Sequence, residues 1–184
     1  MIRVFDFFLS LISLILSVPI LATFAILIFI SGENPIFIQV RLGARNINFN
    51  LIKLRTLKSD TPNTATHDLA EVNYVFLGKF LRKTKLDELP QLINVLLGDM
   101  SLVGYRPCLP SQSSLVELRN KYMVSKNRPG ITGLAQVLGV DMSTPRKLVR
   151  FEKIYEGKKS FSLYLFVLKK TFLGRIKKES TPTT

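Results

Sequence analysis

The stretch Lys83–Gly104, KTKLDELPQLINVLLGDMSLVG, sets two acidic residues, Asp87 and Glu88, side by side just before a proline. The apolar residues of Leu86–Leu97 recur at helical spacing, and a glycine follows them as a terminating residue, so we predict one helix over this range. A shorter helix over Leu77–Lys83 precedes it. The acid pair therefore lies where a loop enters a helix.

Three interpretations of this acid pair are open. Thr84 and Asp87 have the spacing of a capping box, and acidic residues in a first helical turn also complement the helix dipole. Glu88 could instead pair with a neighbouring cation on a solvated face. The third interpretation is chemical, because charged residues gather around the pair in the sequence. These residues are Arg82, Lys83, Lys85, Asp99, Arg106 and Arg128.

Both Arg106 and Arg128 precede a proline, which biases the arginine backbone towards extended geometry. A guanidinium fork on a stiffened backbone suits phosphate oxygens. The glycines of RPGITGLAQV, Gly130 and Gly133, either mark a turn or allow the backbone to approach a ligand closely. This part of the chain therefore favours an anionic ligand.

The composition narrows the class of protein. The 184 residues are 47% hydrophobic, enough for one compact domain with an appendage, which excludes a disordered chain. A formal charge of +13 implies a polyanionic partner: nucleic acid, an anionic membrane surface or a phosphorylated substrate. Cys108 is the single cysteine and His67 the single histidine, so a disulfide framework and a Cys/His zinc cluster are excluded. Any chemistry belongs to carboxylates and cations.

The range from Phe7 to Gly32 contains no charged side chain. A straight helix over it would reach about 39 Å, more than the ~30 Å of a hydrocarbon core, and nothing in it resembles a signal cleavage site. Pro19 interrupts this run, and Ser17 could satisfy a carbonyl freed by the break. A kinked span and a re-entrant helix that returns to the same face are both open. The excess of cations after Gly32 predicts a cytoplasmic location for the rest.

The remaining chain contains three further segments. Alternating apolar residues predict strands over 36–40 and 47–51, joined by a turn at Gly43–Asn46. Residues 59–73 are predicted to be a polar surface loop that could close over a site, with a solvated His67. The stretch from Phe161 to Lys178 is basic and amphipathic, so it is either an interfacial membrane helix or a core-facing helix with a solvated edge. Residues 179–184 are predicted to be a frayed tail.

Three motifs in this order, together with the apolar N-terminus, closely resemble the bacterial sugar transferase family, the small monotopic phosphoglycosyl transferases. The motifs are KLRTL at 53–57, LDELPQLINVLLGDMSLVGYRP at 86–107 and RPGITGLAQV at 128–137. The resemblance extends from about Arg3 to Lys178. Each motif alone is weak, and their combination is specific.

The resemblance implies an enzyme that moves a phospho-sugar from a UDP-sugar, of an N-acetylated hexosamine type, to polyprenyl (undecaprenyl) phosphate and releases UMP. By this match Asp87 is the nucleophile that attacks the β-phosphate and forms an aspartyl phospho-sugar intermediate. Glu88 assists, and both acids hold Mg²⁺. A diphosphate accepts a negative nucleophile only after its oxygens are neutralised. The residues expected to bind the phosphates are Lys53, Arg82, Arg106 and Arg128.

The same resemblance favours the re-entrant form, because family members carry a membrane helix broken at a Ser-Pro pair and Pro19 occupies that proline position. Here Val18 precedes the proline and Ser17 lies one place earlier. Other departures are Lys85 where a serine is common and Tyr105 where a proline commonly precedes Arg-Pro. The stretch LGVDMSTP at 138–145 replaces the usual continuation, which leaves the identity of the sugar open.

The expected fold is α+β and mostly α. Its predicted parts are a re-entrant membrane helix over 1–32, a catalytic domain with a small β-hairpin over 33–160, an interfacial helix over 161–178 and a tail. The expected location is the cytoplasmic face of a bacterial inner membrane. Anionic lipids are expected partners, nucleic acid is not, and a homodimer is left open. The alternative function is a non-enzymatic basic membrane-anchored adaptor that binds nucleic acid or anionic lipid; the sequence contains no recognised nucleic-acid module.

Overall fold

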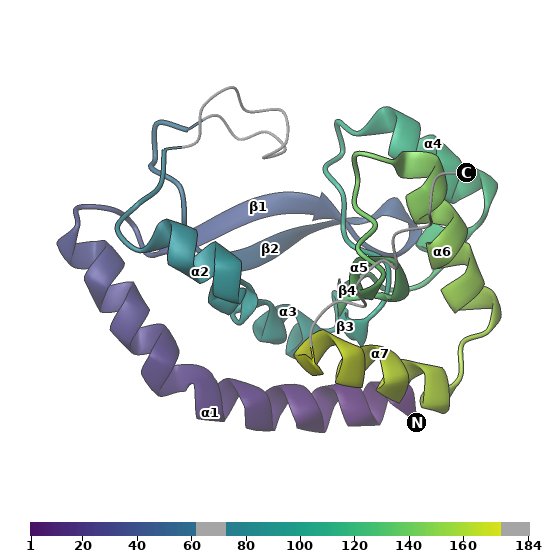
Figure 1. The fold of residues 1–184 in the computed structure, drawn as a ribbon, viewed down its shortest axis with the longest axis horizontal. Coiled ribbons are helices and arrows are strands. Elements are labelled where there is room, and N and C mark those ends of the chain that lie inside the picture. Colours follow the sequence, from purple (N-terminus) through teal and green to yellow (C-terminus); the bar gives the residue numbers. More distant parts are fainter. Residues whose placement is uncertain (62–72, 174–184) are drawn as a thin grey trace, which may run out of the picture. The chain divides into compact units, whose positions relative to one another are not determined.

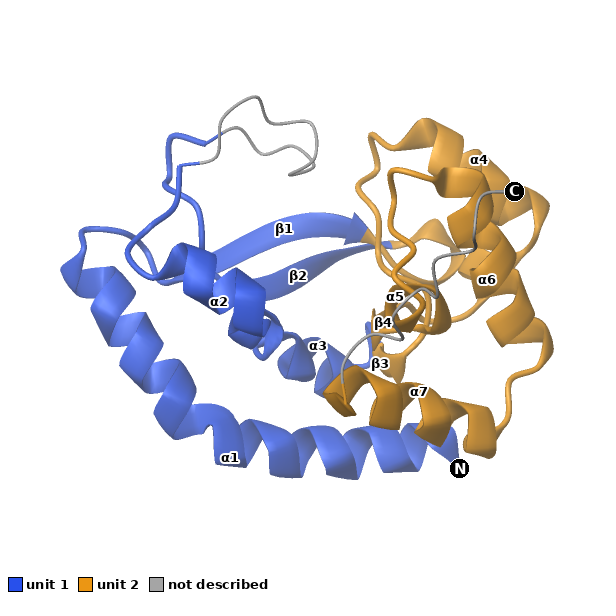
Figure 2. Ribbon diagram, viewed as in Figure 1, with its two compact units in different colours: residues 1–41, 48–100 blue, residues 42–47, 101–184 orange. Residues whose placement is uncertain are grey.

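The computed structural model describes residues 1–61 and 73–173, and this part of the chain is mostly helical with small two-stranded sheets (Figure 1). This confirms the predicted class. The chain divides into two compact units, coloured in Figure 2. Unit 1 comprises Met1–Arg41 and Asn48–Met100, and unit 2 comprises Leu42–Ile47 and Ser101–Thr184. The predicted boundaries at 32, 160 and 178 concern membrane attachment and stay predictions.

The apolar N-terminus forms one helix, α1 (Ile2–Ile30), with Pro19 inside it. Figure 1 shows that α1 bends partway along its length, and proline is the usual cause of such a bend because it removes a backbone donor. Side-chain hydroxyls accompany the bend: Ser17 Oγ donates to the Leu14 carbonyl (2.9 Å) and Thr23 Oγ1 donates to the Pro19 carbonyl (2.9 Å). The carbonyl that Pro19 leaves without its helical donor is that of Ile15, so the predicted role of Ser17 in satisfying a freed carbonyl stays a prediction.

The burial pattern of α1 is reversed relative to a helix of a soluble core. Its buried residues are Asp6, Ser10, Ser17 and Ile28. Large apolar side chains along the helix are instead exposed. They include Phe8, Ile12, Ile15, Leu16, Val18, Ile26 and Phe29. By length and composition α1 could cross a membrane, and it is the helix of the described ranges 1–61 and 73–173 that meets this criterion.

Both ends of α1 are attached to unit 1. Near the start, α1 packs on α3 (Gln91–Leu97), and the Arg3 guanidinium donates to the Val95 carbonyl (2.5 Å) and the Leu96 carbonyl (3.1 Å). Near the other end, Ile28 is buried in an apolar cluster with Leu54, Val75 and Leu81, against which Leu21 and Phe24 also pack.

The predicted hairpin is confirmed. Strands β1 (Ile36–Leu42) and β2 (Asn48–Leu54) pair in one sheet and are joined by the short 3-10 turn η1 (Ala44–Asn46). Arg45 and Asn46 have positive φ values of 55° and 59°, which lets the chain reverse within so few residues. The Gly43 N–H closes the turn on the Ile47 carbonyl (2.8 Å).

The helix predicted over Leu86–Leu97 is wrong in its start. Helix α2 (Gly78–Thr84) ends at Lys85, whose φ of 60° breaks the helical path, and a 3-10 turn, η3 (Leu86–Glu88), follows before α3 begins. The capping box is also wrong: Thr84 Oγ1 donates to the Phe80 carbonyl (2.8 Å) of its own helix. Gly98 ends α3 with a φ of 98°, as predicted.

Unit 2 is built around a short parallel pair, β3 (Ser101–Val103) and β4 (Gly130–Thr132), which sequence analysis did not predict. The glycines around it are required by close backbone packing. A Cβ at Gly130 would lie 2.0 Å from the Gly104 nitrogen, and a Cβ at Gly133 would lie 2.1 Å from the Gly104 carbonyl oxygen. These glycines therefore allow two segments of the backbone of unit 2 to pack closely against each other. The space next to them is filled by protein backbone and not by a ligand.

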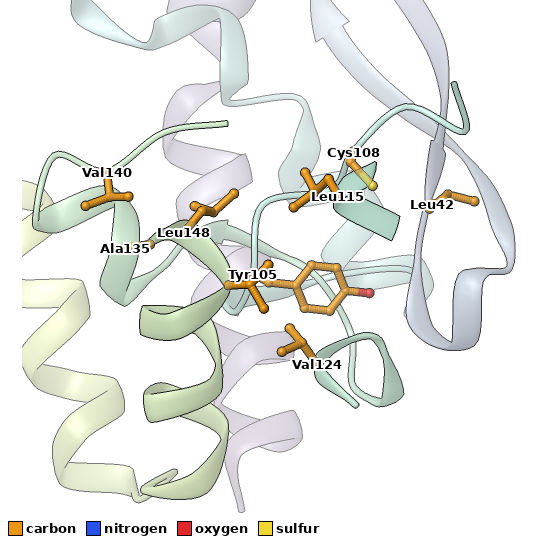
Figure 3. Packing of buried hydrophobic residues seen from close by; sticks show 9 residues of the cluster. Leu42, Tyr105, Cys108, Leu115, Val124, Ala135, Val140 and Leu148 are labelled. Atoms are coloured by element: carbon orange, nitrogen blue, oxygen red, sulfur yellow. The ribbon is translucent and has the colours of Figure 1, made fainter. Parts of the chain in front are cut away.

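The apolar core of unit 2 is shown in Figure 3, where the Tyr105 ring lies among Leu115, Val124 and Leu148. Leu115 comes from α4 (Ser113–Lys121), Val124 from the 3-10 turn η4 (Val124–Lys126) and Leu148 from α6 (Pro145–Gly157). The short helix α5 (Leu134–Val137) adds Ala135.

The last described helix is α7 (Phe161–Leu173), which packs on β3, β4 and α5. Tyr164 and Val167 are fully buried, so one face of α7 is core-facing. Apolar side chains on its other face are exposed: Phe161, Leu165, Phe166, Phe172 and Leu173. Predictions about His67 and about the cations Arg175, Lys177 and Lys178 lie outside the described residues.

Candidate active site

The acid pair lies on η3, directly after the left-handed residue Lys85. Asp87 is buried, with 7% of its surface exposed, and the Glu88 side chain is 13% exposed. The backbone fixes this turn locally, since the Glu88 N–H donates to the Lys85 carbonyl (3.1 Å) and Pro90 leads into α3. Two adjacent carboxylates are thereby held at low exposure, where an uncompensated negative charge is costly.

Lys53 compensates part of this charge. It lies on β2, which packs against η3, and its Nζ is 3.3 Å from Glu88 Oε1. The two side chains are 17% and 13% exposed, so solvent screens this ion pair less than an exposed one. The structure therefore brings Lys53, a residue predicted from the KLRTL motif, directly to the acid pair.

Arg82 lies on α2, which also packs against η3. Its Nε donates to the buried Thr56 Oγ1 (2.7 Å), and its guanidinium carbon is 5.8 Å from the centre of the Tyr74 ring. These contacts hold a half-buried guanidinium in one orientation. Four predicted site residues, Lys53, Arg82, Asp87 and Glu88, thus belong to three adjoining elements of unit 1.

The two predicted Arg-Pro pairs belong to unit 2, where their backbones meet. The Gly130 N–H donates to the Tyr105 carbonyl (2.8 Å), and a Cβ at Gly104 would lie 2.7 Å from the Arg128 carbonyl oxygen. Arg106 is half-buried and Arg128 is exposed. The structure therefore brings together the backbone segments that carry these two arginines, within unit 2.

The sequence profile described as "Bacterial sugar transferase" matches residues 1–178 of this chain. The chain belongs to the bacterial sugar transferase family. Similar proteins carry related names. A "UDP-glucose:undecaprenyl-phosphate glucose-1-phosphate transferase" from Caulobacter vibrioides is 37% identical over 143 residues, covering 75% of this chain and 54% of that protein.

Two further relatives widen the range of sugars named. A "UDP-N-acetylgalactosamine-undecaprenyl-phosphate N-acetylgalactosaminephosphotransferase" from Aeromonas hydrophila is 34% identical over 175 residues, 90% of this chain and 41% of that protein. A "UDP-glucose:undecaprenyl-phosphate glucose-1-phosphate transferase" from Escherichia coli K12 is 39% identical over 144 residues, 74% of this chain and 31% of that protein. The chain therefore spans between about a third and a half of the length of these relatives.

Sequence reasoning missed two buried polar groups that connect elements within this family member. Asn94 is fully buried and joins α3 to β2: its Oδ1 accepts from the Ile52 N–H (3.1 Å) and its Nδ2 donates to the Asn50 carbonyl (2.8 Å). Arg119 and Glu152 form a buried ion pair in unit 2. A signal existed for this pair, because each residue lies four positions after a core leucine of its helix, Leu115 or Leu148.

The side chains expected to hold Mg²⁺ are the Asp87 and Glu88 carboxylates. Within 1–61 and 73–173 no group of three or more His, Cys, Asp or Glu side chains forms a metal cage. Mg²⁺ is usually held by one or two carboxylates together with waters and substrate phosphates, so an adjacent acid pair fits this ion without a third protein ligand.

Proposed function

We propose that this chain transfers a phospho-sugar from a UDP-sugar to undecaprenyl phosphate with release of UMP. The observation that carries the proposal is the acid pair Asp87–Glu88, held at low exposure beside Lys53 in a chain that matches the bacterial sugar transferase family over residues 1–178. The names of the relatives supply the substrate classes.

The proposed mechanism has two displacements at one phosphorus. An Asp87 oxygen attacks the β-phosphorus of the UDP-sugar, the bond from that phosphorus to the bridging oxygen breaks, and UMP leaves with the electron pair. A phosphate oxygen of undecaprenyl phosphate then attacks the same phosphorus and displaces the Asp87 carboxylate. The product is an undecaprenyl diphosphate sugar, and the enzyme returns to its starting state. A carboxylate nucleophile of this kind divides one difficult transfer into two easier steps.

Charge compensation makes this attack feasible, because a carboxylate and a diphosphate repel each other. Lys53 offsets the charge of Glu88 at 3.3 Å, and Arg82 is held beside the same turn by Thr56. Mg²⁺, bound to Asp87 and Glu88, would supply further neutralisation of the phosphate oxygens. Arg106 and Arg128 are proposed to bind donor phosphates as well.

The attachment of α1 supports a monotopic, re-entrant placement. Arg3 at its start bonds α3, and Ile28 near its end is buried with Leu81 of α2, so both ends belong to one compact unit. A straight crossing of a ~30 Å core would put these ends on opposite sides of the bilayer. The exposed apolar side chains of α1 and of α7 supply the surfaces for lipid, and Lys169 and Lys170 of α7 suit anionic headgroups. We place unit 1 on the cytoplasmic face.

The principal experiment is UMP release by purified protein with undecaprenyl phosphate, Mg²⁺ and a panel of UDP-sugars. Asp87→Asn should abolish both UMP release and a phospho-sugar adduct detected by mass spectrometry, whereas Glu88→Gln should reduce turnover strongly. Glu117→Gln, an exposed acid of α4, is the matched control and should keep wild-type turnover. Normal turnover by Asp87→Asn would refute the nucleophile assignment.

The panel must contain both UDP-glucose and N-acetylated UDP-hexosamines, because the relatives are named for both kinds of sugar. We propose an N-acetylated hexosamine as the better donor. Faster UMP release with UDP-glucose would reject that choice and leave the reaction class intact. Binding of nucleic acid with no turnover of any UDP-sugar would favour the basic adaptor instead.

The re-entrant placement has a separate test. In a Cys108→Ala background, single cysteines at the exposed positions Val4 and Lys58 should both react with a membrane-impermeant reagent only from the cytoplasmic side. Labelling of Val4→Cys from the periplasm alone would establish a span.

A further inference from the structure

A buried ion pair joins two helices of unit 2. The Arg119 side chain on α4 is 1% exposed and the Glu152 side chain on α6 is 3% exposed. Arg119 Nε donates to Glu152 Oε2 (2.9 Å) and Nη2 donates to Oε1 (2.5 Å), which is the bidentate fork geometry. Removing two charges from water costs free energy that an apolar pair of similar volume would not require. Stability alone therefore does not account for this buried ion pair.

The same guanidinium reaches the backbone of a proposed phosphate-binding residue. Arg119 Nη2 also donates to the Arg106 carbonyl (2.9 Å), and its guanidinium carbon lies 4.7 Å from the centre of the Tyr105 ring. A cation over an aromatic face is an attractive contact, and burial strengthens it. The ion pair therefore contacts two consecutive residues, Tyr105 through its ring and Arg106 through its backbone carbonyl.

Tyr105 is fixed from other directions as well. Its hydroxyl donates to the Gly43 carbonyl (2.8 Å), and its carbonyl accepts the Gly130 N–H (2.8 Å). Burial raises the pKa of Tyr105 well above its usual value, so the hydroxyl stays protonated and remains a donor. Pro107 restricts the backbone on the other side of Arg106.

The exposure pattern shows what this fixed backbone carries. Every residue of Ser101–Leu109 is buried except Arg106, which is half-buried. The segment thus presents one cationic side chain from a run whose other members are packed into unit 2. A guanidinium on an immobile backbone loses less conformational freedom when it binds an anion than one on a mobile loop.

We propose that the Arg119–Glu152 ion pair, with Tyr105, is a positioning device that fixes the backbone of Arg106 for binding the diphosphate of the donor. The identity of that ligand rests on the proposed function; the restraint of the segment does not. Arg119 and Glu152 act through Arg106 and do not themselves contact substrate.

The test replaces the pair with apolar residues of similar size, Arg119→Met with Glu152→Leu, because this exchange can preserve folding. Glu117→Leu with Arg150→Met, exposed residues on the same two helices, is the matched control. Misplacement of a binding group by about 1 Å can cost on the order of 100-fold. We expect the buried exchange to lower kcat/KM for the UDP-sugar by roughly 10- to 100-fold, mainly through KM, with a Tm close to that of the control.

A double-mutant cycle separates positioning from general damage. In an Arg106→Ala background the buried exchange should cost less than about twofold, because the group that it positions is gone. Equal losses with and without Arg106, or no loss in either background, would overturn the proposal. A small effect of Arg106→Ala itself would also overturn it and leave the proposed transferase function standing.

Hydrogen exchange gives a readout that does not require turnover. The N–H groups of Tyr105 and Arg106 should exchange faster in the buried-exchange variant than in the control, with little change in α4. Unchanged exchange at these positions would refute the restraint even if UMP release failed in every protein. Should the double variant not fold, Arg119→Lys, which keeps the charge and loses the fork, takes its place with the same expected directions.

Discussion

The sharpest prediction concerns Asn94, whose buried amide imitates a neighbouring β-strand. It accepts from the Ile52 N–H and donates to the Asn50 carbonyl, which are the groups that a parallel strand would pair on β2. Asn94→Asp changes one atom from nitrogen to oxygen and leaves the volume intact. The acceptor for Ile52 is kept, but the donor to Asn50 becomes a second acceptor at about the same 2.8 Å separation.

The expected cost follows from the contacts. An unsatisfied, part-buried carbonyl costs about 1–3 kcal/mol, and burial of the new carboxylate near Asp99, which lies 3.3 Å from the amide nitrogen, adds to it. We take about 3 kcal/mol, which corresponds to raising the pKa of the new carboxyl by roughly two units above its usual ~3.9. In a chain of this size that loss lowers Tm by about 6–12 °C.

The sign of the pH dependence is the decisive readout. Because the folded-state pKa of the new carboxyl is raised, its penalty is absent below the unfolded pKa and grows as the pH rises through the folded value. Protonation also restores a donor to Asn50. The Tm deficit relative to wild type, measured on detergent-purified protein, should therefore be largest at pH 8 and roughly half as large at pH 5, which lies between the unfolded and the folded pKa. Asn48→Asp, at an exposed position of β2, the strand that Asn94 bonds, is the control. A deficit independent of pH, or one no larger than the control's, would refute this reasoning.

Three other perturbations have defined outcomes. Gly130→Ala puts a Cβ 2.0 Å from a backbone nitrogen and should cost more than about 3 kcal/mol, seen as a collapse of Tm, whereas Gly157→Ala, with no atom within 4 Å, should be neutral. Hydrogen bonds from Ser59 hold the pKa of Glu33 below its usual value. Their contribution to the free energy of unfolding is therefore present above the unfolded-state pKa and is lost as the pH falls through the folded-state pKa. Ser59→Ala should move the pKa of Glu33 back up, as measured by an NMR titration. Arg3→Gln removes charge-assisted bonds to α3 and should lower Tm by a few degrees, from about 1.5–3 kcal/mol; an unchanged Tm would mean that α1 docks without it.

Local patterns predicted local structure well in this chain. The hairpin with its turn at Gly43–Asn46 followed from alternation and turn residues, and the end of α3 at Gly98 followed from its glycine. The same method was wrong at Thr84. This residue has the spacing of a capping box, but it lies in the last turn of α2 and its hydroxyl bonds a carbonyl of that helix. The left-handed φ of Lys85 decides that junction, and lysine gives no signal for such a conformation.

Contacts between distant segments were beyond the sequence. The parallel pairing of β3 with β4 joins residues 101–103 to 130–132, and no periodicity within either three-residue strand encodes the partner. The glycines at 104, 130 and 133 gave a hint, but the chemistry of a glycine does not say whether ligand or backbone will occupy the space. The motifs predicted Lys53 and Glu88 as separate site residues, and the structure adds that their side chains form an ion pair.

The N-terminal helix shows why composition left its topology open. A kinked span and a re-entrant helix have the same hydropathy, so the apolar run could not separate them. The polar residues in and just before the run carry more information, because Asp6, Ser10 and Ser17 fall at helical spacing on one face, and all three are buried. Three polar side chains of α1 thus face protein while large apolar side chains face outward, which is the pattern expected of a helix with protein on one side and lipid on the other. That arrangement supports the proposed re-entrant placement, in which the bend at Pro19 would allow both ends of α1 to stay attached to unit 1.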